Sequence, residues 1–343
     1  MYVDLSFLVP VGTFSTTPTL GLAGSWLGSF LSLVWSLACT HGFPSSGNFP
    51  CVVCVWAMRA GSKKILEAAL RQYEDQEYLQ LRYTCNTSQL PSEIASQFVQ
   101  LDKDEETIAF LNKSRRNSGN ICLQLLYTCV QILLSLFFSQ TSINGLLEKG
   151  RMFVFSTKHL SLLLPSVSPA LVLDIGSGDG HVTDKIRESF GVKSIRVTEM
   201  SRVMQRTLRK KKYQVLSVEK WHEEEVSYDL ISCLNVLDRC DTPLTMLKRM
   251  HNKLSPGGHL LLTLVLPYQP FVESWASQAP PSEVLPLNEG DCWEEGVGEL
   301  WEKTLKPLGF ELMAVSRLPY LCEGDLNQDY FSLDDAVFVL KKK

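Results

Sequence analysis

The second half of the chain alternates short apolar runs with stretches in which apolar residues recur at helical spacing. The apolar runs predict seven strands, at 170–174, 194–198, 213–218, 228–234, 259–266, 310–316 and 336–340. The stretches between them predict four helices, at 182–190, 204–211, 243–254 and 293–306. Strands that alternate with helices indicate an α/β domain with a doubly wound, mostly parallel sheet. No helix is predicted between the last two strands, so we expect them to pair antiparallel at the edge of the sheet.

The N-terminal 58 residues have a different composition, because no Asp, Glu, Lys or Arg occurs between Leu5 and Met58. Within them, the uncharged run 20–39 is about as long as a membrane-spanning helix requires. It could be a signal anchor, or a signal peptide with a long lead. A third interpretation is an aberrant start of the gene model, with Met58 near the true beginning. Membrane or secretory targeting is the favoured interpretation.

Residues 59–165 are expected to form a helical extension. Apolar side chains at 59–80 fall at i, i+3, i+4 and i+7, which predicts an amphipathic helix. A second uncharged stretch, 117–147, is interrupted by polar residues such as Gln124 and Gln131. These interruptions favour a buried helix packed on the α/β domain over a membrane span. The chain is therefore expected to divide into the segment 1–58, the extension 59–165 and an α/β domain at 166–343.

Composition narrows the choice of partners. A hydrophobic fraction of 45% and a charged fraction of 20% are typical of a globular protein. The formal net charge of −4 offers no overall attraction to nucleic acid, and the basic run 209–212 is typical of a solvated helix end. Among ten cysteines, Cys51 and Cys54 form the only C-x-x-C pair, which argues against a structural zinc site. We therefore expect neither a nucleic-acid partner nor a bound metal.

The strongest chemical signal is the sequence VLDIGSGDG at 172–180, in which an apolar strand runs into a glycine-rich turn and then a helix. Glycines let the backbone adopt positive φ and let a ligand approach without a Cβ clash. The nicotinamide fingerprint is G-x-G-x-x-G, whereas the glycines here are spaced G-x-G-x-G. The Asp179 carboxylate would repel a pyrophosphate but not a sulfonium amino acid. The loop therefore favours a cationic cofactor, with Asp174, Gly176 and Gly178 among its binding residues.

Polar residues follow two further strands at the same end of the predicted sheet. Glu199 closes the second strand, where a carboxylate can accept hydrogen bonds from both hydroxyls of a ribose. Asn235 and Asp238 follow the fourth strand, whose carboxyl end lies over the cofactor in a doubly wound sheet. For Asp238, capping of the next helix is a competing explanation. We expect these positions to face the reacting groups.

Five longer strings are far rarer than a glycine loop. They are SCLNVLDRCD at 232–241, LVLPY at 264–268, TSINGLL at 141–147, RLPYLCEGD at 317–325 and LDDAVFVLK at 333–341. By these strings, the chain from about residue 83 to its end resembles the DREV family of methyltransferases. The first 60 or so residues do not resemble the usual start of that family.

The resemblance implies a class I, Rossmann-like methyltransferase domain with a seven-stranded sheet, an N-terminal helical extension, and S-adenosyl-L-methionine as cofactor. It implies an enzyme that methylates the pros nitrogen, Nδ1, of histidine in His-x-His sequences of proteins, where x is small. Zinc-binding proteins are candidate partners, because a methylated Nδ1 can no longer bind a metal. Two alternatives stay open. One is a methyltransferase of the same fold acting on another protein residue or a small molecule, and the other is an inactive cofactor-binding scaffold.

The resemblance also assigns roles to single residues. Cofactor contacts carry over to Glu199, Asn235 and Tyr320, besides the loop residues. The expected catalytic residues are Asn235, Asp238 and Tyr330, and Asp238 is expected to accept the Nε2–H of the substrate imidazole. Tyr330 lies where the family tends to show paired tyrosines, and a phenylalanine follows it here. The expected location is the endoplasmic reticulum, with the mitochondrion as the alternative and with membrane association through the N-terminal segment.

Overall fold

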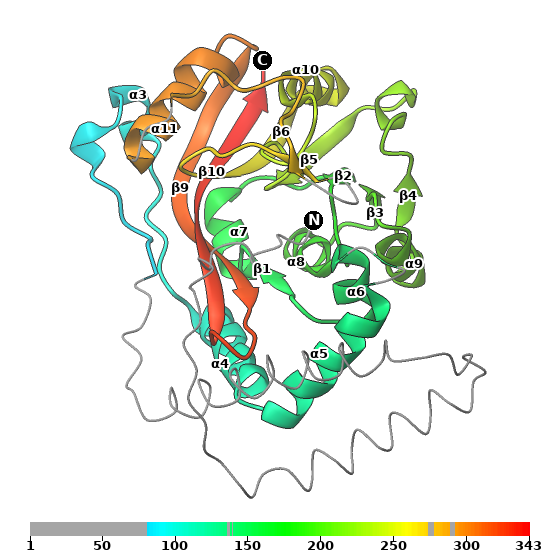
Figure 1. Cartoon of the computed structure of the whole chain (residues 1–343). Helices are drawn as coiled ribbons and strands as arrows, with labels where there is room; N and C mark the ends of the chain where they lie inside the picture. The colour runs from blue at the N-terminus through cyan, green and yellow to red at the C-terminus, as the bar shows by residue number, and fades with distance from the viewer. Residues whose placement is uncertain (1–80, 136–137, 139, 274–277, 289–291) are drawn as a thin grey trace, which may run out of the picture. The chain divides into compact units, whose positions relative to one another are not determined.

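The computed structural model describes residues 81–135, 138, 140–273, 278–288 and 292–343, and all of them belong to one compact unit (Figure 1). The uncharged segment 1–58 and the predicted helix at 59–80 lie outside the described residues. The domain boundaries expected at 58 and 165 stay predictions.

The described residues form an eight-stranded sheet in the order β1-β9-β10-β6-β5-β2-β3-β4. Its strands are β1 (Met152–Phe153), β2 (Leu171–Ile175), β3 (Ser194–Thr198), β4 (Gln214–Leu216), β5 (Tyr228–Leu234), β6 (Leu254–Val265), β9 (Phe310–Glu323) and β10 (Tyr330–Lys342). The five strands from β6 to β4 in this order are parallel, as predicted. The α/β, doubly wound fold class is confirmed. The sheet has eight strands rather than seven because the short β1 pairs antiparallel with β9.

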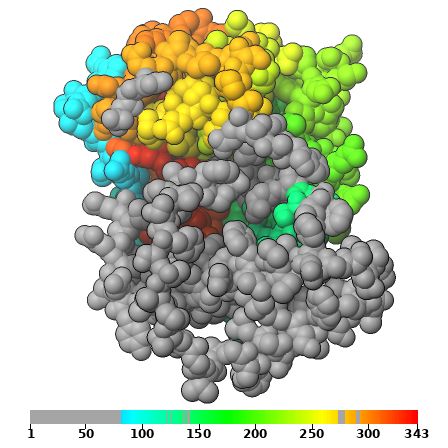
Figure 2. Space-filling view, viewed as in Figure 1, coloured from blue at the N-terminus to red at the C-terminus, as the bar shows by residue number. Residues whose placement is uncertain are grey.

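Helices cover both faces of the sheet (Figure 1). One face carries α7 (Thr157–Leu163), α8 (His181–Phe190) and α9 (Arg202–Lys210), and the other carries α10 (Pro243–Lys253) and α11 (Trp293–Leu300) with its π-helical continuation η4 (Trp301–Leu305). The four predicted helices are confirmed close to their predicted bounds. Shorter elements are η2 (Thr87–Gln89), α3 (Ser92–Ser96), η3 (Trp221–Glu223), and the two-stranded sheet of β7 (Val272–Glu273) and β8 (Gln278–Ala279). In Figure 2, the yellow and orange segments between β6 and α11 form one surface between the cyan and green segments.

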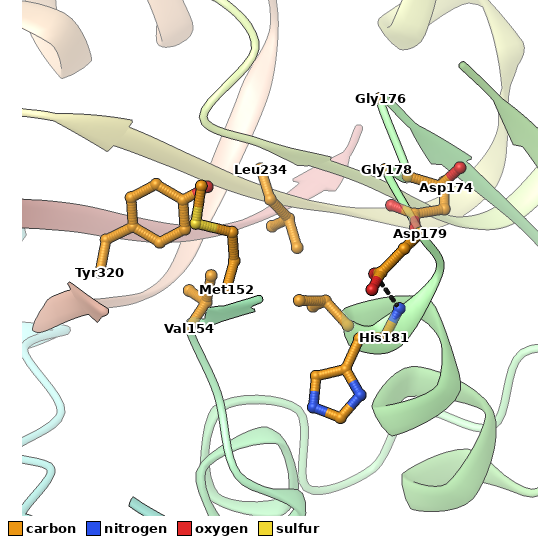
Figure 3. A pocket seen from close by; sticks show the side chains of 11 residues that line it. Met152, Val154, Asp174, Gly176, Gly178, Asp179, His181, Leu234 and Tyr320 are labelled. Atoms are coloured by element: carbon orange, nitrogen blue, oxygen red, sulfur yellow. Dashed lines mark hydrogen bonds between the residues drawn. The ribbon is translucent and has the colours of Figure 1, made fainter. Parts of the chain in front are cut away.

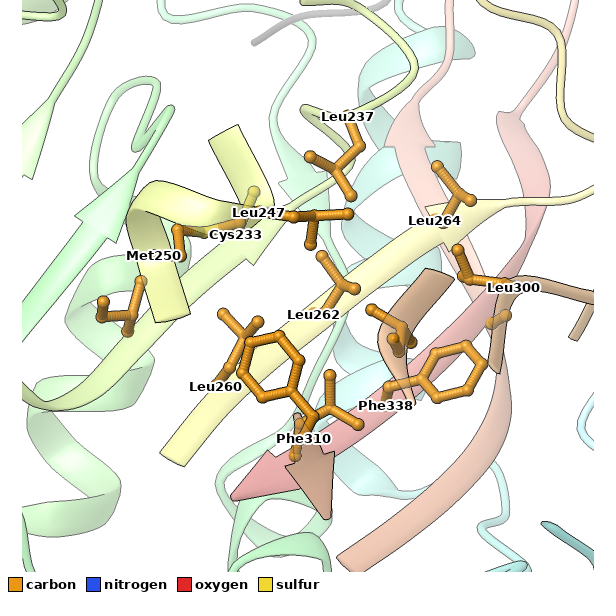
Figure 4. Packing of buried hydrophobic residues seen from close by; sticks show 14 of the residues in the cluster. Cys233, Leu237, Leu247, Met250, Leu260, Leu262, Leu264, Leu300, Phe310 and Phe338 are labelled. Carbon is orange, nitrogen blue, oxygen red and sulfur yellow. The ribbon is translucent and has the colours of Figure 1, made fainter. Parts of the chain in front are cut away.

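The central strands are buried on both faces, which explains their nearly continuous apolar sequences. In β6, Leu260, Leu262 and Leu264 pack in one apolar cluster, whereas Leu261 packs in the other, as the two-residue period of a strand requires. Figure 4 shows the first cluster, to which Phe338 of β10 also belongs. Each such fully buried side chain contributes about 1.5–3 kcal/mol of hydrophobic free energy. The sheet is therefore a rigid base for the loops at its carboxyl edge.

The last two strands form a long antiparallel hairpin, β9–β10, as predicted, but its position and length differ from the prediction. β10 lies between β6 and β9, so it is inside the sheet rather than at its edge. Both strands extend beyond the predicted ranges, because their pairing continues until Tyr330 lies opposite Glu323. The extended part of β9 pairs with β1. This pairing brings residues 152–154, which we call the β1 segment, to the edge of the sheet at which the parallel strands end.

The helices α4 (Glu105–Ser118), α5 (Ile121–Leu134) and α6 (Gln140–Leu146) lie between α3 and β1 in the chain. The expectation that this uncharged stretch forms a buried helix was wrong. Among the side chains of α5 that the structure describes, only Gln124 is buried, whereas Leu126 and Leu133 are 48% and 57% exposed. The polar interruptions lie on the covered side, where they bond to neighbouring helices. Within the described residues, no helix is both long and apolar enough to cross a membrane.

Candidate active site

The glycine-rich loop between β2 and α8 has the backbone conformation that its sequence predicts. Gly176, Gly178 and Gly180 have φ angles of 72°, 56° and 77°, in the left-handed region that residues with a Cβ adopt only at a cost. A Cβ on Gly176 would lie 2.6 Å from Cγ2 of Val236, so the position has no space for a larger residue. The loop can therefore bring its backbone close to a ligand.

Glu199, directly after β3, fixes this loop. Its Oε2 accepts a hydrogen bond from the N–H of Gly178 at 2.9 Å, and its Oε1 accepts one from the N–H of Ser201 at 2.7 Å. The N–H of Gly176 donates to the carbonyl of Thr198 at 3.0 Å. Each carboxylate oxygen can accept a second hydrogen bond, so Glu199 keeps capacity for the hydroxyls of a ribose. These hydrogen bonds hold the glycine loop and the end of β3 in one fixed arrangement before a ligand binds.

Asp174 ties three elements together at the base of the loop. Its Oδ1 accepts a hydrogen bond from Oγ of Ser232 on β5 at 2.6 Å, and its Oδ2 accepts one from Oγ1 of Thr183 on α8 at 2.5 Å. Burial raises the pKa of Asp174, while the two hydrogen bonds lower it by a smaller amount. Both oxygens are engaged within the protein, so Asp174 holds the loop in place.

A cavity of about 480 Å³ opens beside the loop (Figure 3). It is lined by residues of the loop, the start of α8, the end of β5, β9 and the β1 segment: Met152, Val154, Asp174, Gly176, Ser177, Gly178, Asp179, His181, Val182, Leu234 and Tyr320. Oδ1 of Asp179 accepts a hydrogen bond from the N–H of His181 at 2.9 Å, which turns this carboxylate toward α8.

Five of the lining residues were not predicted from the sequence, and Val182 on α8 is one of them. Met152 and Val154 come from the β1 segment, whose apolar run carries no signal that ties it to the loop. His181 and Leu234 are direct neighbours of predicted positions, and this adjacency could have found them. Burial lowers the pKa of His181, so its imidazole is neutral at pH 7 and does not repel a cation in the cavity.

Asn235 is held by a residue that sequence reasoning missed. Its backbone is left-handed, with a φ of 54°. Its Nδ2 donates to Oδ2 of Asp335 at 2.8 Å, and its Oδ1 accepts a hydrogen bond from Oγ1 of Thr263 at 3.0 Å. Asp335 is fully buried, and burial raises its pKa well above the ordinary value. The only signal for Asp335 was an acid inside an otherwise apolar strand.

Asp238 is the second polar residue after β5, and it is 3% exposed. Its Oδ2 lies 2.7 Å from Nη1 of Arg239, whereas its Oδ1 has no hydrogen-bond partner among the described residues. Burial raises the pKa of Asp238, and Arg239 opposes this rise. The Arg239 guanidinium lies 3.8 Å from the centre of the Phe271 ring and donates to the carbonyl of Gln269 at 3.1 Å. Arg239 therefore fixes the orientation of the Asp238 carboxylate.

The two tyrosines named from the sequence lie in different places. Tyr320 lines the cavity, and burial raises its pKa well above the ordinary value, with a further rise from the charges of Asp335 and Asp238. Tyr330 packs in a separate apolar cluster with Phe110, Phe153 and Leu321, and it is not among the residues that line the cavity. The structure therefore brings Asp174, both loop glycines and Tyr320 to one cavity, with Glu199 bonded to the loop. Asn235, Asp238 and Tyr330 are not among the residues that line it.

The site fits a positively charged methyl donor such as S-adenosylmethionine. Asp179 and Glu199 supply carboxylates beside the cavity, and Met152 and Leu234 supply apolar walls. Opposite charges attract more strongly in such a partly buried site than in water. These residues would hold the ribose, the amino-acid part and the adenine at the ends of β2, β3 and β5.

The chain is similar to several solved structures. Two similar solved structures are the N-methyltransferase NodS from Bradyrhizobium japonicum WM9 in complex with S-adenosyl-L-homocysteine, and a protein of Listeria monocytogenes described as an S-adenosylmethionine-dependent methyltransferase. NodS is 18% identical, with a TM-score of 0.34, over 54% of this chain and 84% of its own. The Listeria protein is 14% identical, with a TM-score of 0.38, over 54% of this chain and 96% of its own.

The family comparison covers most of the chain. The model of the DREV methyltransferase family matches residues 82–342, which include every described residue of the loop and the cavity. The family match and the residues around the cavity both indicate S-adenosylmethionine as the cofactor. The chain belongs to the DREV family of methyltransferases.

Proposed function

We propose that this methyltransferase transfers a methyl group to the pros nitrogen, Nδ1, of a histidine in His-x-His sequences of proteins, with a small residue at x. The family strings around Asn235 and Tyr320 support this substrate class. The observation that carries the proposal is Oδ1 of Asp238, which is buried and has no partner among the described residues. An acceptor buried in this way costs about 1–3 kcal/mol unless a ligand supplies a donor. The N–H of an imidazole is a donor of the required kind.

A histidine side chain needs positioning more than activation. Its unperturbed pKa is about 6.5, so much of it is neutral at pH 7 and one ring nitrogen carries a lone pair. S-adenosylmethionine, when bound, supplies a methyl group already activated by a sulfonium. Asp238 accepts the Nε2–H, which selects the tautomer with its lone pair on Nδ1. The new N–C bond forms as the C–S bond breaks, and the imidazolium passes its Nε2 proton to solvent on release.

The environment of Asp238 suits this role. Arg239 occupies Oδ2 at 2.7 Å, so Oδ1 is the carboxylate oxygen that has no hydrogen-bond partner among the described residues. Burial raises the pKa of the Asp238 carboxyl toward that of imidazolium, which strengthens its hydrogen bond with the Nε2–H as positive charge develops on the ring. The positive charge of Arg239 opposes this rise in the pKa of Asp238. Positioning of this kind can contribute several kcal/mol of the barrier, of order 7 kcal/mol in favourable cases.

The proposal extends to partners and location. Methylation of Nδ1 removes that nitrogen as a metal ligand, so zinc-binding proteins with His-x-His sequences are the proposed partners. A location in the endoplasmic reticulum, with the mitochondrion as the alternative, rests on the composition of residues 1–58.

The test is a methylation assay on the full chain. Labelled S-adenosylmethionine is incubated with peptides that contain His-Ala-His, a single His, or Lys, and the hydrolysed product is separated into Nδ1-methylhistidine and Nε2-methylhistidine. We expect label only in the His-Ala-His peptide and only at Nδ1. Label at Nε2, at Lys or on a small molecule would support a different methyltransferase. Cofactor binding without turnover would support an inactive scaffold.

A pair of variants tests the role of Asp238. Asp238→Asn removes the charge that stabilises the imidazolium, so kcat/KM is expected to fall at least about 100-fold, the lower bound for loss of an acid–base group. Asp241→Asn is the matched control, because Asp241 is exposed and bonds to Ser282 at the surface. Cofactor affinity should be the same in both variants. Equal activity of the two variants would remove Asp238 from the mechanism.

A further inference from the structure

Helix α5 has two faces of opposite character. Gln124, Thr128 and Gln131 lie on one face and bond within the helices: Nε2 of Gln124 donates to the carbonyl of Asn117 at 3.0 Å, and Nε2 of Gln131 donates to Oδ1 of Asn144 at 3.4 Å. Oγ1 of Thr128 donates to the carbonyl of Gln124 at 2.9 Å. The polar face is therefore satisfied by α4, α5 and α6.

Two leucines of α5 lie on its other face. Leu126 and Leu133 are 48% and 57% exposed. At about 100° per residue, these leucines point roughly 160° away from Gln124 and Gln131. The helix thus buries Gln124 and exposes two large apolar side chains, whereas a helix that packs on a core buries its apolar stripe.

Two further large apolar side chains after α5 in the chain are exposed. Phe138 is 40% exposed and Leu146 of α6 is 47% exposed, and we call these two with Leu126 and Leu133 the α5–α6 apolar surface. Between Arg116 and Glu148 the chain carries no charged side chain. A protein partner would normally find about one hydrogen bond per 100–200 Å² of interface, whereas the acyl region of a lipid bilayer needs none. The chemistry of this surface therefore favours lipid.

Basic residues lie on the helix against which α6 packs. The hydroxyls of Ser142 and Ser201 are 3.3 Å apart, and a Cβ on Gly145 of α6 would meet the side chain of Met204 on α9 at 2.6 Å. α9 has no acidic residue and exposes a stripe of basic ones at i, i+4 and i+7, with two more at its end: Arg202, Arg206, Arg209, Lys210 and Lys212. Met200, directly before this helix, is 73% exposed.

We propose that the α5–α6 apolar surface and the basic stripe of α9 dock this protein on a membrane surface that contains anionic phospholipids. The leucines and Phe138 enter the boundary between headgroups and acyl chains, and the arginines contact lipid phosphates. α5 has 14 residues, fewer than the roughly 20 that a span requires, so it lies in the plane of the interface. The proposal does not depend on the identity of the methylated residue.

The test is sedimentation of the full chain with phosphatidylcholine vesicles, with and without phosphatidylserine. Two double variants probe the two parts of the surface: Leu126→Gln with Leu133→Gln, and Arg202→Glu with Arg206→Glu. Each is expected to lower partitioning to anionic vesicles by at least about tenfold, because each basic residue near the surface contributes roughly 1 kcal/mol and buried leucines contribute more. Cofactor affinity and circular dichroism should not change, which separates docking from misfolding.

Matched controls come from other helices. Leu162 of α7 is 49% exposed, about as much as Leu126, and Lys248 of α10 is exposed on the other face of the sheet. Leu162→Gln and Lys248→Glu should bind vesicles as the unchanged chain does. Because residues 1–58 are the same in every variant, undiminished binding of both double variants would overturn the proposal. A dimer that becomes a monomer in the leucine variant would also overturn it, by assigning the surface to a second copy.

Discussion

At Gly176, a single added methyl group would meet Val236 at 2.6 Å while the backbone holds a φ of 72°. The left-handed conformation alone costs an L-residue about 1–2 kcal/mol, and the clash adds to it. The loop must move to relieve both, so Gly176→Ala is expected to raise the Kd for S-adenosylmethionine at least about tenfold, equivalent to 1.4 kcal/mol. Isothermal titration calorimetry would measure this change.

Gly191 offers the matched control for this prediction. It ends α8 with a φ of 63°, and an added Cβ would have nothing within 4 Å. Gly191→Ala should lower the free energy of unfolding by about 1 kcal/mol and leave the Kd for the cofactor unchanged. Equal changes in Kd for the two variants would show that the loop does not contact the cofactor.

Asp335 carries a prediction about pH. Its Oδ2 accepts a hydrogen bond from Asn235 at 2.8 Å, and burial raises its pKa well above the ordinary value. A carboxyl whose pKa is higher in the folded state contributes stability that is complete below its unfolded pKa of about 3.9 and is lost as pH rises through the folded pKa. Asp335→Asn removes this titration. Its free energy of unfolding, relative to the unchanged chain, should therefore increase as pH rises from the unfolded pKa of about 3.9 through the raised folded pKa of Asp335.

Urea unfolding at several pH values would measure that difference. Asp229→Asn is a suitable comparison, because the Asp229 side chain is only half-buried. It lies near the start of β5 and accepts hydrogen bonds from the backbone N–H groups of Ala170 and Leu171. Stability curves for Asp335→Asn and the unchanged chain that run parallel over the whole range would contradict the prediction.

Local patterns located part of the site. Asp174, Gly176 and Gly178 were predictable because strand, turn and glycine spacing are continuous in sequence, and all three line the cavity. Asp335 was not, because its partner Asn235 lies 100 residues earlier and no local pattern links a strand acid to a distant amide. Tyr330 was placed by resemblance, and the hairpin directs it into an apolar cluster away from the cavity.

Among the elements, the β9–β10 hairpin depends on one buried ion pair. Nη2 of Arg317 lies 2.5 Å from Oδ2 of Asp334, with side chains that are 9% and 18% exposed. Asp334→Asn leaves the guanidinium without this partner, and we expect a loss of about 3 kcal/mol in the free energy of unfolding, the lower end for broken buried pairs. The value is at the lower end because Glu294 stays 3.6 Å from the same guanidinium.

A surface pair of similar length is the control for this prediction. Nζ of Lys303 lies 2.7 Å from Oε1 of Glu299, with the lysine 42% exposed. Lys303→Gln should cost less than about 1 kcal/mol, because solvent screens such pairs. Chemical denaturation of both variants would compare them, and similar costs would show that the hairpin does not rely on Arg317.

Strand limits were predictable where the strand lies in the middle of the sheet. β3 and β5 have the predicted limits, because their apolar runs end where the parallel pairing ends. β9 and β10 are longer than predicted, because their outer residues pair with each other and those of β9 also pair with β1. α5 was wrongly expected to be buried, since the hydrogen bonds of its polar residues to α4 and α6 cannot be read from the pattern.

For the molecule as a whole, the cavity joins parts of the chain that are far apart. Met152, Gly176, Leu234 and Tyr320 belong to four strands or strand ends, so no short segment forms the site alone. A ligand that bridges these parts binds the folded state and has no comparable site in the unfolded chain. Cofactor binding is therefore coupled to the stability of the entire described unit.

This coupling predicts a thermal shift. At a cofactor concentration of about 100 times Kd, the free energy of unfolding should increase by about 2.7 kcal/mol, which corresponds to a rise in Tm of about 5–10 °C for a unit of this size. S-adenosylhomocysteine should give a similar rise, and Gly176→Ala should show a smaller rise at the same concentration because its Kd is higher. Differential scanning calorimetry would measure all three. No shift with either ligand would mean that the cavity beside the glycine loop does not bind the methyl donor, and the histidine proposal would lose its basis with it.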